Sequence, residues 1–220
     1  MKQNLLIEFR DAYAGPWPRA LRHILMIAWR RWKLKKRSRK VADFVFLDTE
    51  TTGLDDDAEL VEIAVVDDTG AVLFESYCRP TVPVDPGAQA VHGIGPEKLA
   101  TAPAWPEIAE RVRSALEGKT VVIFNSDFDT RILVQTATAH TDGQGQAAYD
   151  AAVGWILGLD TKCAMYRAAD AFGATNQYGT ISLINAAAAA GVEFQGKAHS
   201  AAGDAATTAE LWRCMMTSRK

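Results

Sequence analysis

Two acidic residues follow directly after a short apolar run in the first quarter of the chain. The run, residues 44–47 (Phe-Val-Phe-Leu), is typical of a buried strand, and Asp48 and Glu50 come immediately after it. In an extended backbone, residues two apart point to the same face, so the two carboxylates converge. Like charges at close range repel, which makes this pair costly without a cation. Carboxylate oxygens suit Mg²⁺ or Mn²⁺, and the sequence therefore predicts a divalent metal site here.

Further candidate residues lie where two helices are expected to start. Asp129 follows a second apolar run, residues 120–124, and Asp127 stands two positions earlier as a competing candidate. His199 and Asp204 lie around the start of the last expected helix. Acidic residues are also common at helix N-termini, where they interact with the helix dipole. On these grounds alone, the choice between Asp127 and Asp129 stays open.

The elements that position these residues can be predicted from hydrophobic periodicity and turn signals. After the strand at 44–47, segments 59–67 and 71–79 flank an Asp-Thr-Gly turn and are expected to form a hairpin. The remaining expected elements are a helix over 106–116, a strand over 120–124, a helix over 128–138, a loop over 140–148, a strand over 155–159, and helices over 162–172, 182–190 and 201–216. Antiparallel strands followed by strand–helix alternation predict an α/β domain with a mixed central sheet.

Length and cysteine usage favour a single globular body in a reducing compartment. A chain of 220 residues suits one domain with a sizeable core. The three cysteines, Cys78, Cys163 and Cys214, are far apart and form no CxxC pair. This spacing argues against a disulfide framework or a zinc site and suits a cytoplasmic protein.

Charge is divided unevenly along the chain. Residues 1–40 hold 12 Lys and Arg against two acidic residues, a net charge of +10, whereas residues 41–220 hold 12 basic and 25 acidic residues, a net charge of −13. We therefore expect a basic N-terminal extension over 1–40, partly helical, followed by an acidic domain over 41–220. An acidic surface repels a polyanion, and clustered carboxylates that hold cations would account for part of the excess.

The basic extension admits three interpretations. Its longest apolar run, residues 24–29, is too short to span a membrane, and the Lys and Arg that follow do not suit a secretory signal. Apolar residues at helical spacing over 21–32 predict a helix, which could pack on the acidic domain. Alternatively, the basic residues over 30–40 contact nucleic-acid phosphates. The third interpretation is contact of residues 21–40 with an anionic surface or a protein partner.

Three segments, in order along the chain, carry a recognisable set of motifs. They are Asp48–Leu54 (Asp-Thr-Glu-Thr-Thr-Gly-Leu), Asn125–Asp129 (Asn-Ser-Asp-Phe-Asp) and His199–Asp204 (His-Ser-Ala-Ala-Gly-Asp), with the loop Val91–Ile94 (Val-His-Gly-Ile) between the first two. Over residues 43–216 the chain resembles the DEDDh exonucleases, the family of the proofreading epsilon subunit of bacterial DNA polymerase III. The match selects Asp129 over Asp127. The four residues between histidine and aspartate in the third motif match the His branch of the family rather than the Tyr branch.

The resemblance implies a ribonuclease H-like fold with a two-metal site. It implies Asp48, Glu50, Asp129 and Asp204 as catalytic ligands of two Mg²⁺ or Mn²⁺ ions, and His199 as the general base. Substrate contacts are expected at Thr49, Thr51, Leu54, His92 and Asn125. The chain departs from the family at Gly87, where relatives often carry an acidic residue that helps to bind the nucleotide.

The function predicted from these residues is removal of nucleoside monophosphates from single-stranded 3′ ends. Hydrolysis of DNA is one hypothesis, and hydrolysis of RNA ends or short oligoribonucleotides is another, because the motifs do not reveal how the pocket treats the 2′-hydroxyl. A non-catalytic nucleic-acid-binding module is a third hypothesis, and it predicts losses among the five active-site residues, none of which is missing. Proofreading would require a polymerase or another replication or repair protein as a partner.

Overall fold

The computed structural model describes residues 43–141 and 143–217. The basic extension over 1–40 lies outside these residues, so its expected helix, its boundary with the acidic domain and its role stay predictions. Within the described residues, no helix combines the length and the apolar character needed to cross a membrane.

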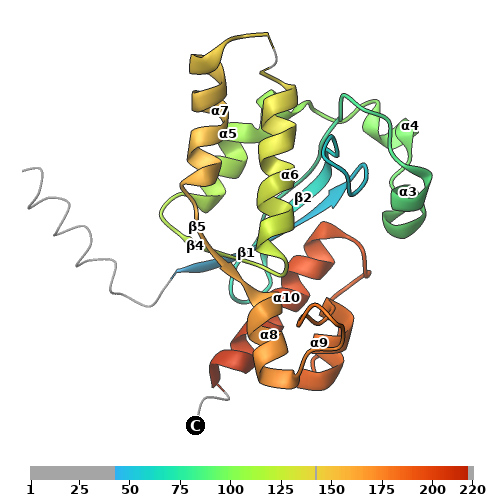
Figure 1. Cartoon of the computed structure of the whole chain (residues 1–220), viewed down its shortest axis with the longest axis vertical. Coiled ribbons are helices and arrows are strands. Elements are labelled where there is room, and N and C mark those ends of the chain that lie inside the picture. Colours follow the sequence, from blue (N-terminus) through green and yellow to red (C-terminus); the bar gives the residue numbers. More distant parts are fainter. Residues whose placement is uncertain (1–42, 142, 218–220) are drawn as a thin grey trace, which may run out of the picture. The chain divides into compact units, whose positions relative to one another are not determined.

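A mixed five-stranded sheet forms the centre of the described domain (Figure 1). Its strands are β1 (Phe44–Thr51), β2 (Leu60–Val66), β3 (Val72–Tyr77), β4 (Thr120–Ile123) and β5 (Asp160–Cys163), in the order β3-β2-β1-β4-β5. Strands β1, β2 and β3 pair antiparallel, and β4 and β5 join β1 in parallel. The expected hairpin and the expected α/β class are confirmed.

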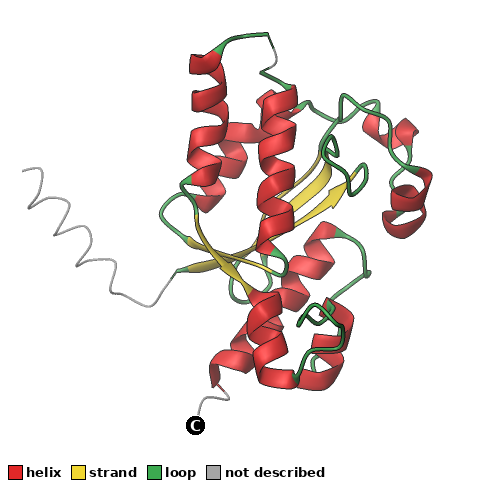
Figure 2. Ribbon diagram, in the orientation of Figure 1, coloured by secondary structure: helices red, strands yellow, loops and turns green. Residues whose placement is uncertain are grey.

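Helices cover both faces of this sheet (Figure 2). They are α3 (Pro86–His92), α4 (Pro96–Leu99), α5 (Trp105–Leu116), α6 (Ser126–Ala139), α7 (Gln146–Leu157), α8 (Ala164–Phe172), α9 (Leu183–Ala190) and α10 (Ala201–Thr217). Helices α5, α6 and α7 share one apolar cluster with the sheet, and α8, α9 and α10 share the other. The sequence did not predict the short helices α3 and α4.

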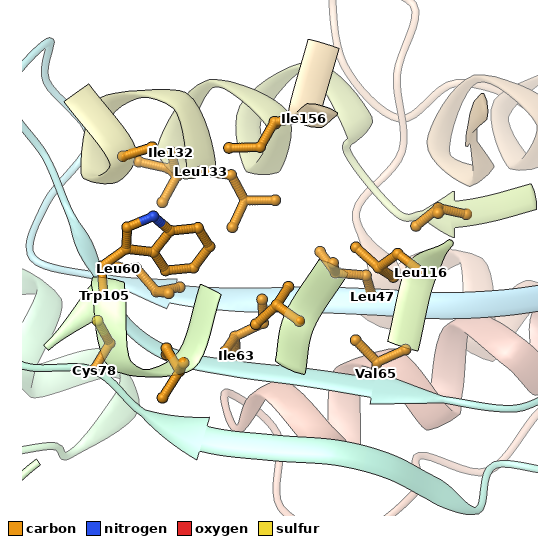
Figure 3. Close-up of a cluster of buried hydrophobic side chains, with 14 of the residues drawn as sticks. Leu47, Leu60, Ile63, Val65, Cys78, Trp105, Leu116, Ile132, Leu133 and Ile156 are labelled. Carbon is orange, nitrogen blue, oxygen red and sulfur yellow. The ribbon is translucent and has the colours of Figure 1, made fainter. Parts of the chain in front are cut away.

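The period-two pattern of β1 divides its side chains between the two clusters. Val45 and Leu47 point into the cluster that includes Trp105, Ile132 and Leu133, which fills the space between the sheet and the overlying helices (Figure 3). Phe46 points the other way, into the cluster beneath α10. Because both faces are packed, β1 is fixed in register and in rotation. The direction of every polar side chain farther along β1 is therefore also fixed.

The strand predicted over 155–159 was wrong, and the helix predicted over 162–172 begins two residues later than expected, at Ala164. The expected strand over 155–159 is the end of α7 and the turn after it, whereas β5 occupies Asp160–Cys163, partly inside the helix expected from residue 162. A short apolar run does not distinguish a strand from a buried helical end. The true strand is polar and lies at the sheet edge, where only its pairing with β4 makes it a strand.

A smaller correction concerns the first strand. It was expected to end at Leu47, with Asp48 and Glu50 just beyond it. In the structure, β1 continues to Thr51, so both acids are members of the strand and pair with β2. The same-face argument for Asp48 and Glu50 holds more strictly as a result, because both residues have extended geometry.

Thr136 joins α6 to the sheet through a buried hydrogen bond. Its fully buried hydroxyl accepts the Leu60 N–H at 2.9 Å and donates to the Ile132 carbonyl. Replacement by the nearly isosteric valine (Thr136→Val) leaves that N–H unsatisfied. We expect the free energy of unfolding to fall by about 1–3 kcal/mol, the usual penalty for a buried polar group without a partner. Urea denaturation measures this loss.

Thr138→Val is the matched control for this prediction. Thr138 lies two residues later on the same helix, is exposed, and only donates to the Val134 carbonyl. Its replacement should change the stability by less than about 0.5 kcal/mol, as surface substitutions usually do. Equal losses in the two variants would contradict the role given to the Leu60 contact.

Candidate functional site

Three carboxylates from β1 and α10 converge at one place. Ligand oxygens of Asp48, Glu50 and Asp204 all lie within 4.8 Å of one another. Asp48 and Glu50 project from the same face of β1, and Asp204 lies in the first turn of α10, which packs on that face. An arrangement of oxygen ligands at this spacing suits a hard divalent cation.

The fourth acid approaches from the other side of the sheet. Asp129 lies in the first turn of α6 and is 4% exposed, whereas Asp127, two residues earlier, is exposed. The hydroxyl of Thr49 donates to Asp129 Oδ1 at 2.7 Å. Because Thr49 lies between Asp48 and Glu50, this bond ties the α6 carboxylate to the strand that carries the other two. The side chain of Thr49, expected to contact substrate, is thus engaged inside the site.

Burial raises the pKa of all four acids, and repulsion from neighbouring members of the group adds to this at Asp48, Glu50 and Asp129. Burial raises the pKa of Asp48 well above its usual range, and repulsion from Asp129, Asp204 and Glu50 adds to this. Burial, with repulsion from Asp204, raises the pKa of Glu50 to about 8. Burial also raises the pKa of Asp129 and, to about 6, that of Asp204. The protein alone therefore does not stabilise full ionisation of the group, as expected of residues that hold cations.

His199 stands exposed beside this group, in a constrained backbone. With φ at 58°, it is the one non-glycine residue of the described chain with positive φ. Its backbone N–H donates to Asp204 Oδ1 at 3.2 Å. The histidine and the aspartate of the third motif are thereby joined directly, and the imidazole lies on the exposed side.

The loop after α3 is attached to the end of β1. His92 is 4% exposed, its Nδ1 accepts the Ile94 N–H at 3.0 Å, and its Nε2 therefore carries the proton and donates to the Thr51 carbonyl at 3.2 Å. Burial lowers the pKa of His92, which favours this neutral ring. Lys197 donates to the His92 carbonyl at 3.2 Å. Both ring nitrogens of His92, an expected substrate contact, are therefore used within the protein.

The loop after β1 is fixed by α6 and leaves one apolar side chain in solvent. Arg131 donates to the carbonyls of Leu54 and Asp55, and Gln135 donates to the latter as well. The Leu54 side chain is 79% exposed. Asn125, the residue before α6, makes no side-chain capping bond to that helix. The sequence did not predict the contributions of Arg131 and Gln135.

A buried glutamate in β2 was also missed. Glu62 is 4% exposed and lies directly opposite Glu50 in the β1–β2 register. Its Oε2 accepts the Ala201 N–H, the first of α10, at 2.9 Å. The available signal was a single charged residue in an otherwise wholly apolar strand, Leu-Val-Glu-Ile-Ala-Val-Val. A buried charge of this kind requires a specific partner.

Comparison with known proteins identifies the family. The RNase_T family model, described as an exonuclease, matches residues 45–212. The chain is 38% identical over 169 residues to an uncharacterized exonuclease, CP81, of Escherichia phage 186, covering 76% of this chain and 84% of that protein. It is also 35% identical over 95 residues to the DNA polymerase III subunit epsilon of Escherichia coli, which covers 39% of each chain.

Solved structures show the same fold. Exonuclease X in complex with 5′ overhanging duplex DNA superposes with a TM-score of 0.57 at 24% identity, covering 80% of this chain and 92% of that one. E. coli Exonuclease I in complex with an oligonucleotide superposes with a TM-score of 0.61 at 22% identity, covering 81% of this chain and 42% of that one.

The fold and the converging carboxylates define a phosphodiester hydrolase of the ribonuclease H-like class. The chain belongs to the exonuclease family, in its DEDDh group, and is a 3′→5′ exonuclease. The expected family and the expected fold class are confirmed.

The raised pKa values predict how pH affects the metal-free protein. The folded protein keeps protons on Glu50 and Asp204 at pH values where the unfolded chain has released them, because the ordinary values are 4.5 and 3.8. The free energy of unfolding should therefore fall as pH rises from about 4 to about 8. Saturating Mn²⁺, which binds the ionised carboxylates of the folded state, should reduce this fall. Thermal melts in EDTA and in Mn²⁺ across that range measure both slopes.

Asp204→Asn provides the control for this pH dependence. It removes one titrating group. The slope in EDTA should therefore flatten over about pH 4 to 6, the interval between the pKa of Asp204 in the unfolded chain, 3.8, and that in the folded protein, about 6. The electrostatic account of the site would be contradicted if the unsubstituted protein had the same slope in EDTA and in Mn²⁺. It would also be contradicted if Asp204→Asn had the same slope in EDTA as the unsubstituted protein.

Proposed function

We propose that this chain removes nucleoside 5′-monophosphates from the 3′ ends of single-stranded DNA. The observation that carries the proposal is the convergence of Asp48, Glu50 and Asp204, whose ligand atoms lie within 4.8 Å of one another, beside the buried Asp129. Membership of the exonuclease family supports the reaction class. DNA as the substrate is supported by the DNA in the Exonuclease X complex and by the polymerase subunits among the relatives.

Four carboxylates are proposed to hold two Mg²⁺ or Mn²⁺ ions. Asp48 experiences repulsion from both Asp129 on α6 and Asp204 on α10, so it would help to hold the cations together with either of them. Glu50 and Asp204 would complete one position, and Asp129, held by Thr49, would complete the other. When bound, such ions lower the pKa of a coordinated water and neutralise charge on the phosphate and the leaving oxygen.

His199 is proposed as the general base. Its exposed imidazole lies next to the carboxylates, and its backbone is fixed to Asp204 at 3.2 Å. An imidazole nitrogen can accept the proton of the attacking water and release it to solvent. The constrained turn keeps the ring near the reacting water without making it a ligand.

Five residues are proposed to position the terminal nucleotide. Leu54, exposed on a loop that α6 holds in place, would act as a wedge that separates the last bases. Asn125 and Thr51 lie where α6 and the loop after β1 begin. Thr49, Thr51 and His92 would contribute main-chain groups, because their side chains are already engaged.

The cellular context forms a further part of the proposal. The three cysteines lie far apart in the sequence and form no CxxC pair, which suits a reducing cytoplasm. The polymerase subunits among the relatives support a polymerase or another replication or repair protein as a partner. The 2′-hydroxyl distinguishes DNA from RNA at any given contact, so the decisive assay includes both polymers.

Single substitutions in the site test the proposed roles. We expect Asp48→Ala, Glu50→Ala, Asp129→Ala and Asp204→Ala each to lose most of the activity with Mg²⁺ or Mn²⁺, and to be strongly non-additive in combination. His199→Ala should lower turnover by about 10²- to 10⁴-fold, the usual contribution of a general base, while Mn²⁺ binding survives. Release of labelled mononucleotides from 3′-labelled single-stranded DNA and RNA measures the activity.

Asp127→Ala is the matched control, because Asp127 lies in the same helical turn as Asp129 and is exposed. It should retain activity within about twofold, as surface substitutions usually do. Undiminished activity in EDTA or in Asp48→Ala would falsify the metal-dependent mechanism. If the protein cleaves RNA in preference to DNA, the proposed substrate is wrong and RNA takes its place. The proposed metal-dependent mechanism is unaffected by that result.

Deletion of residues 1–40 tests the phosphate-binding role of the basic extension. These residues carry a net charge of +10, and the remainder carries −13. If the extension holds substrate, deletion should raise KM on long strands and flatten its dependence on salt, because fewer counterions are released. Turnover of a dinucleotide should stay unchanged. Steady-state rates at several salt concentrations measure both effects.

Other results of this deletion assign other roles. A drop in thermal stability and solubility indicates that the extension packs on the exonuclease domain. Unchanged kinetics with lost binding to anionic vesicles indicate a surface-docking role. A salt slope that does not change rules out phosphate contacts by residues 30–40.

A further inference from the structure

Glu62 is a buried carboxylate that the proposed chemistry does not use. It is the one charged residue of β2 and is 4% exposed. The β1–β2 register places it directly opposite Glu50, so the two side chains project from the same face of the sheet. Two glutamates directly opposite each other repel. A residue in such a position needs a compensating contact on the same face.

The compensating contact comes from the first residue of α10. Glu62 Oε2 accepts the Ala201 N–H at 2.9 Å in a buried hydrogen bond that joins residues 139 apart in the sequence. The first N–H groups of a helix have no partner within the helix and carry its partial positive charge. The bond therefore stabilises the carboxylate and fixes the start of α10 to β2.

The turn that this bond fixes carries two residues of the proposed active site. His199, two residues before Ala201, has a left-handed backbone that its surroundings must impose, and its N–H donates to Asp204 Oδ1. The turn is tightly closed, because a Cβ on Gly203 would lie 2.5 Å from the Lys197 carbonyl oxygen. A displacement of Ala201 would consequently move both the base and the ligand.

We propose that Glu62 is a positioning residue: by holding the Ala201 N–H, it sets His199 and Asp204 in place against Asp48 and Glu50. It acts through these residues and not as a ligand, because its Oε2 is engaged by the Ala201 N–H at the start of α10. The activity readout of this inference rests on the proposed function, and a second readout, the binding of Mn²⁺, does not.

Two uncharged replacements separate the hydrogen bond from the charge. Glu62→Gln keeps an oxygen that can accept the Ala201 N–H. Glu62→Met has a similar length and no such acceptor, and it suits the apolar composition of β2. Both variants lose the same charge, so any difference between them reports the contact with α10. If Glu62→Met does not fold, Glu62→Asp takes its place, because the shorter carboxylate keeps the charge but loses the reach to Ala201.

Relative to Glu62→Gln, we expect Glu62→Met to lower kcat on single-stranded DNA by about 10- to 100-fold and to weaken Mn²⁺ binding by about 10-fold or more. The KM should change by less than about threefold, because the proposed nucleotide contacts lie elsewhere. In a His199→Ala background, the loss in kcat between Glu62→Gln and Glu62→Met should shrink to less than about fivefold, because groups that act as a unit are not additive. Calorimetry with Mn²⁺ alone measures the affinity.

Glu59 provides the matched control. It is also a buried glutamate beside β2, 2% exposed, and its carboxylate accepts the backbone N–H and the hydroxyl of Thr81. Glu59→Met should destabilise the protein relative to Glu59→Gln and leave kcat and Mn²⁺ affinity of the folded fraction within about threefold. This pair reports what loss of a buried carboxylate contact costs without displacing His199.

Equal kcat and equal Mn²⁺ affinity in folded Glu62→Met and Glu62→Gln would overturn the inference. An undiminished loss in kcat in the His199→Ala background would also overturn it. If the unsubstituted protein releases no nucleotides, the proposed function fails. The comparison of Mn²⁺ affinity then still decides whether Glu62 positions Asp204.

Discussion

The structure depends on holding like charges together at the end of β1. Asp48, Glu50 and Asp204 converge within 4.8 Å, and burial raises the pKa of each, with repulsion from neighbouring carboxylates adding to this at Asp48 and Glu50. Such a group opposes folding unless cations or protons neutralise it. The free energy that holds it comes from elsewhere in the domain, because none of the four acids forms a salt bridge within the described residues. The cluster of carboxylates is therefore a destabilising feature that the rest of the fold must support.

Two apolar clusters supply that support from opposite faces of the sheet. The cluster around Trp105 and Leu133 fixes α6, which brings Asp129 to the site, and the cluster around Phe46 and Leu211 fixes α10, which brings Asp204. The carboxylates consequently meet where the two layers approach the same strand. Neither helix can shift without disturbing its apolar cluster, which is why the four acids are held despite their repulsion.

The convergence of Asp48 and Glu50 could be predicted from the sequence more directly than some of the surrounding elements. The spacing of Asp48 and Glu50 in an apolar strand is a local pattern, and strand geometry alone makes it meaningful. The strand at Asp160–Cys163 could not be predicted in this way, because three of its four residues are polar and only its pairing with β4 defines it. The choice of Asp129 over Asp127 also required more than local pattern. The family motif selected it, and the structure gives a physical reason, since only the former is buried and reaches Thr49.

The contacts that position the carboxylates could not be predicted from residue spacing, because each contact joins residues that are distant in sequence. Thr49 holds Asp129 across 80 residues, and Glu62 holds the start of α10 across 139. Candidate ligands can be recognised in the sequence because several acids cluster around apolar runs. A supporting residue has no such pattern, because it is a single polar side chain whose partner is distant in sequence. The one local sign is misplacement: a charge in a fully apolar strand needs a buried partner. Such a residue therefore marks a place where the fold joins two segments that are distant in sequence. In this exonuclease, Glu62 joins β2 to the start of α10 beside the clustered carboxylates.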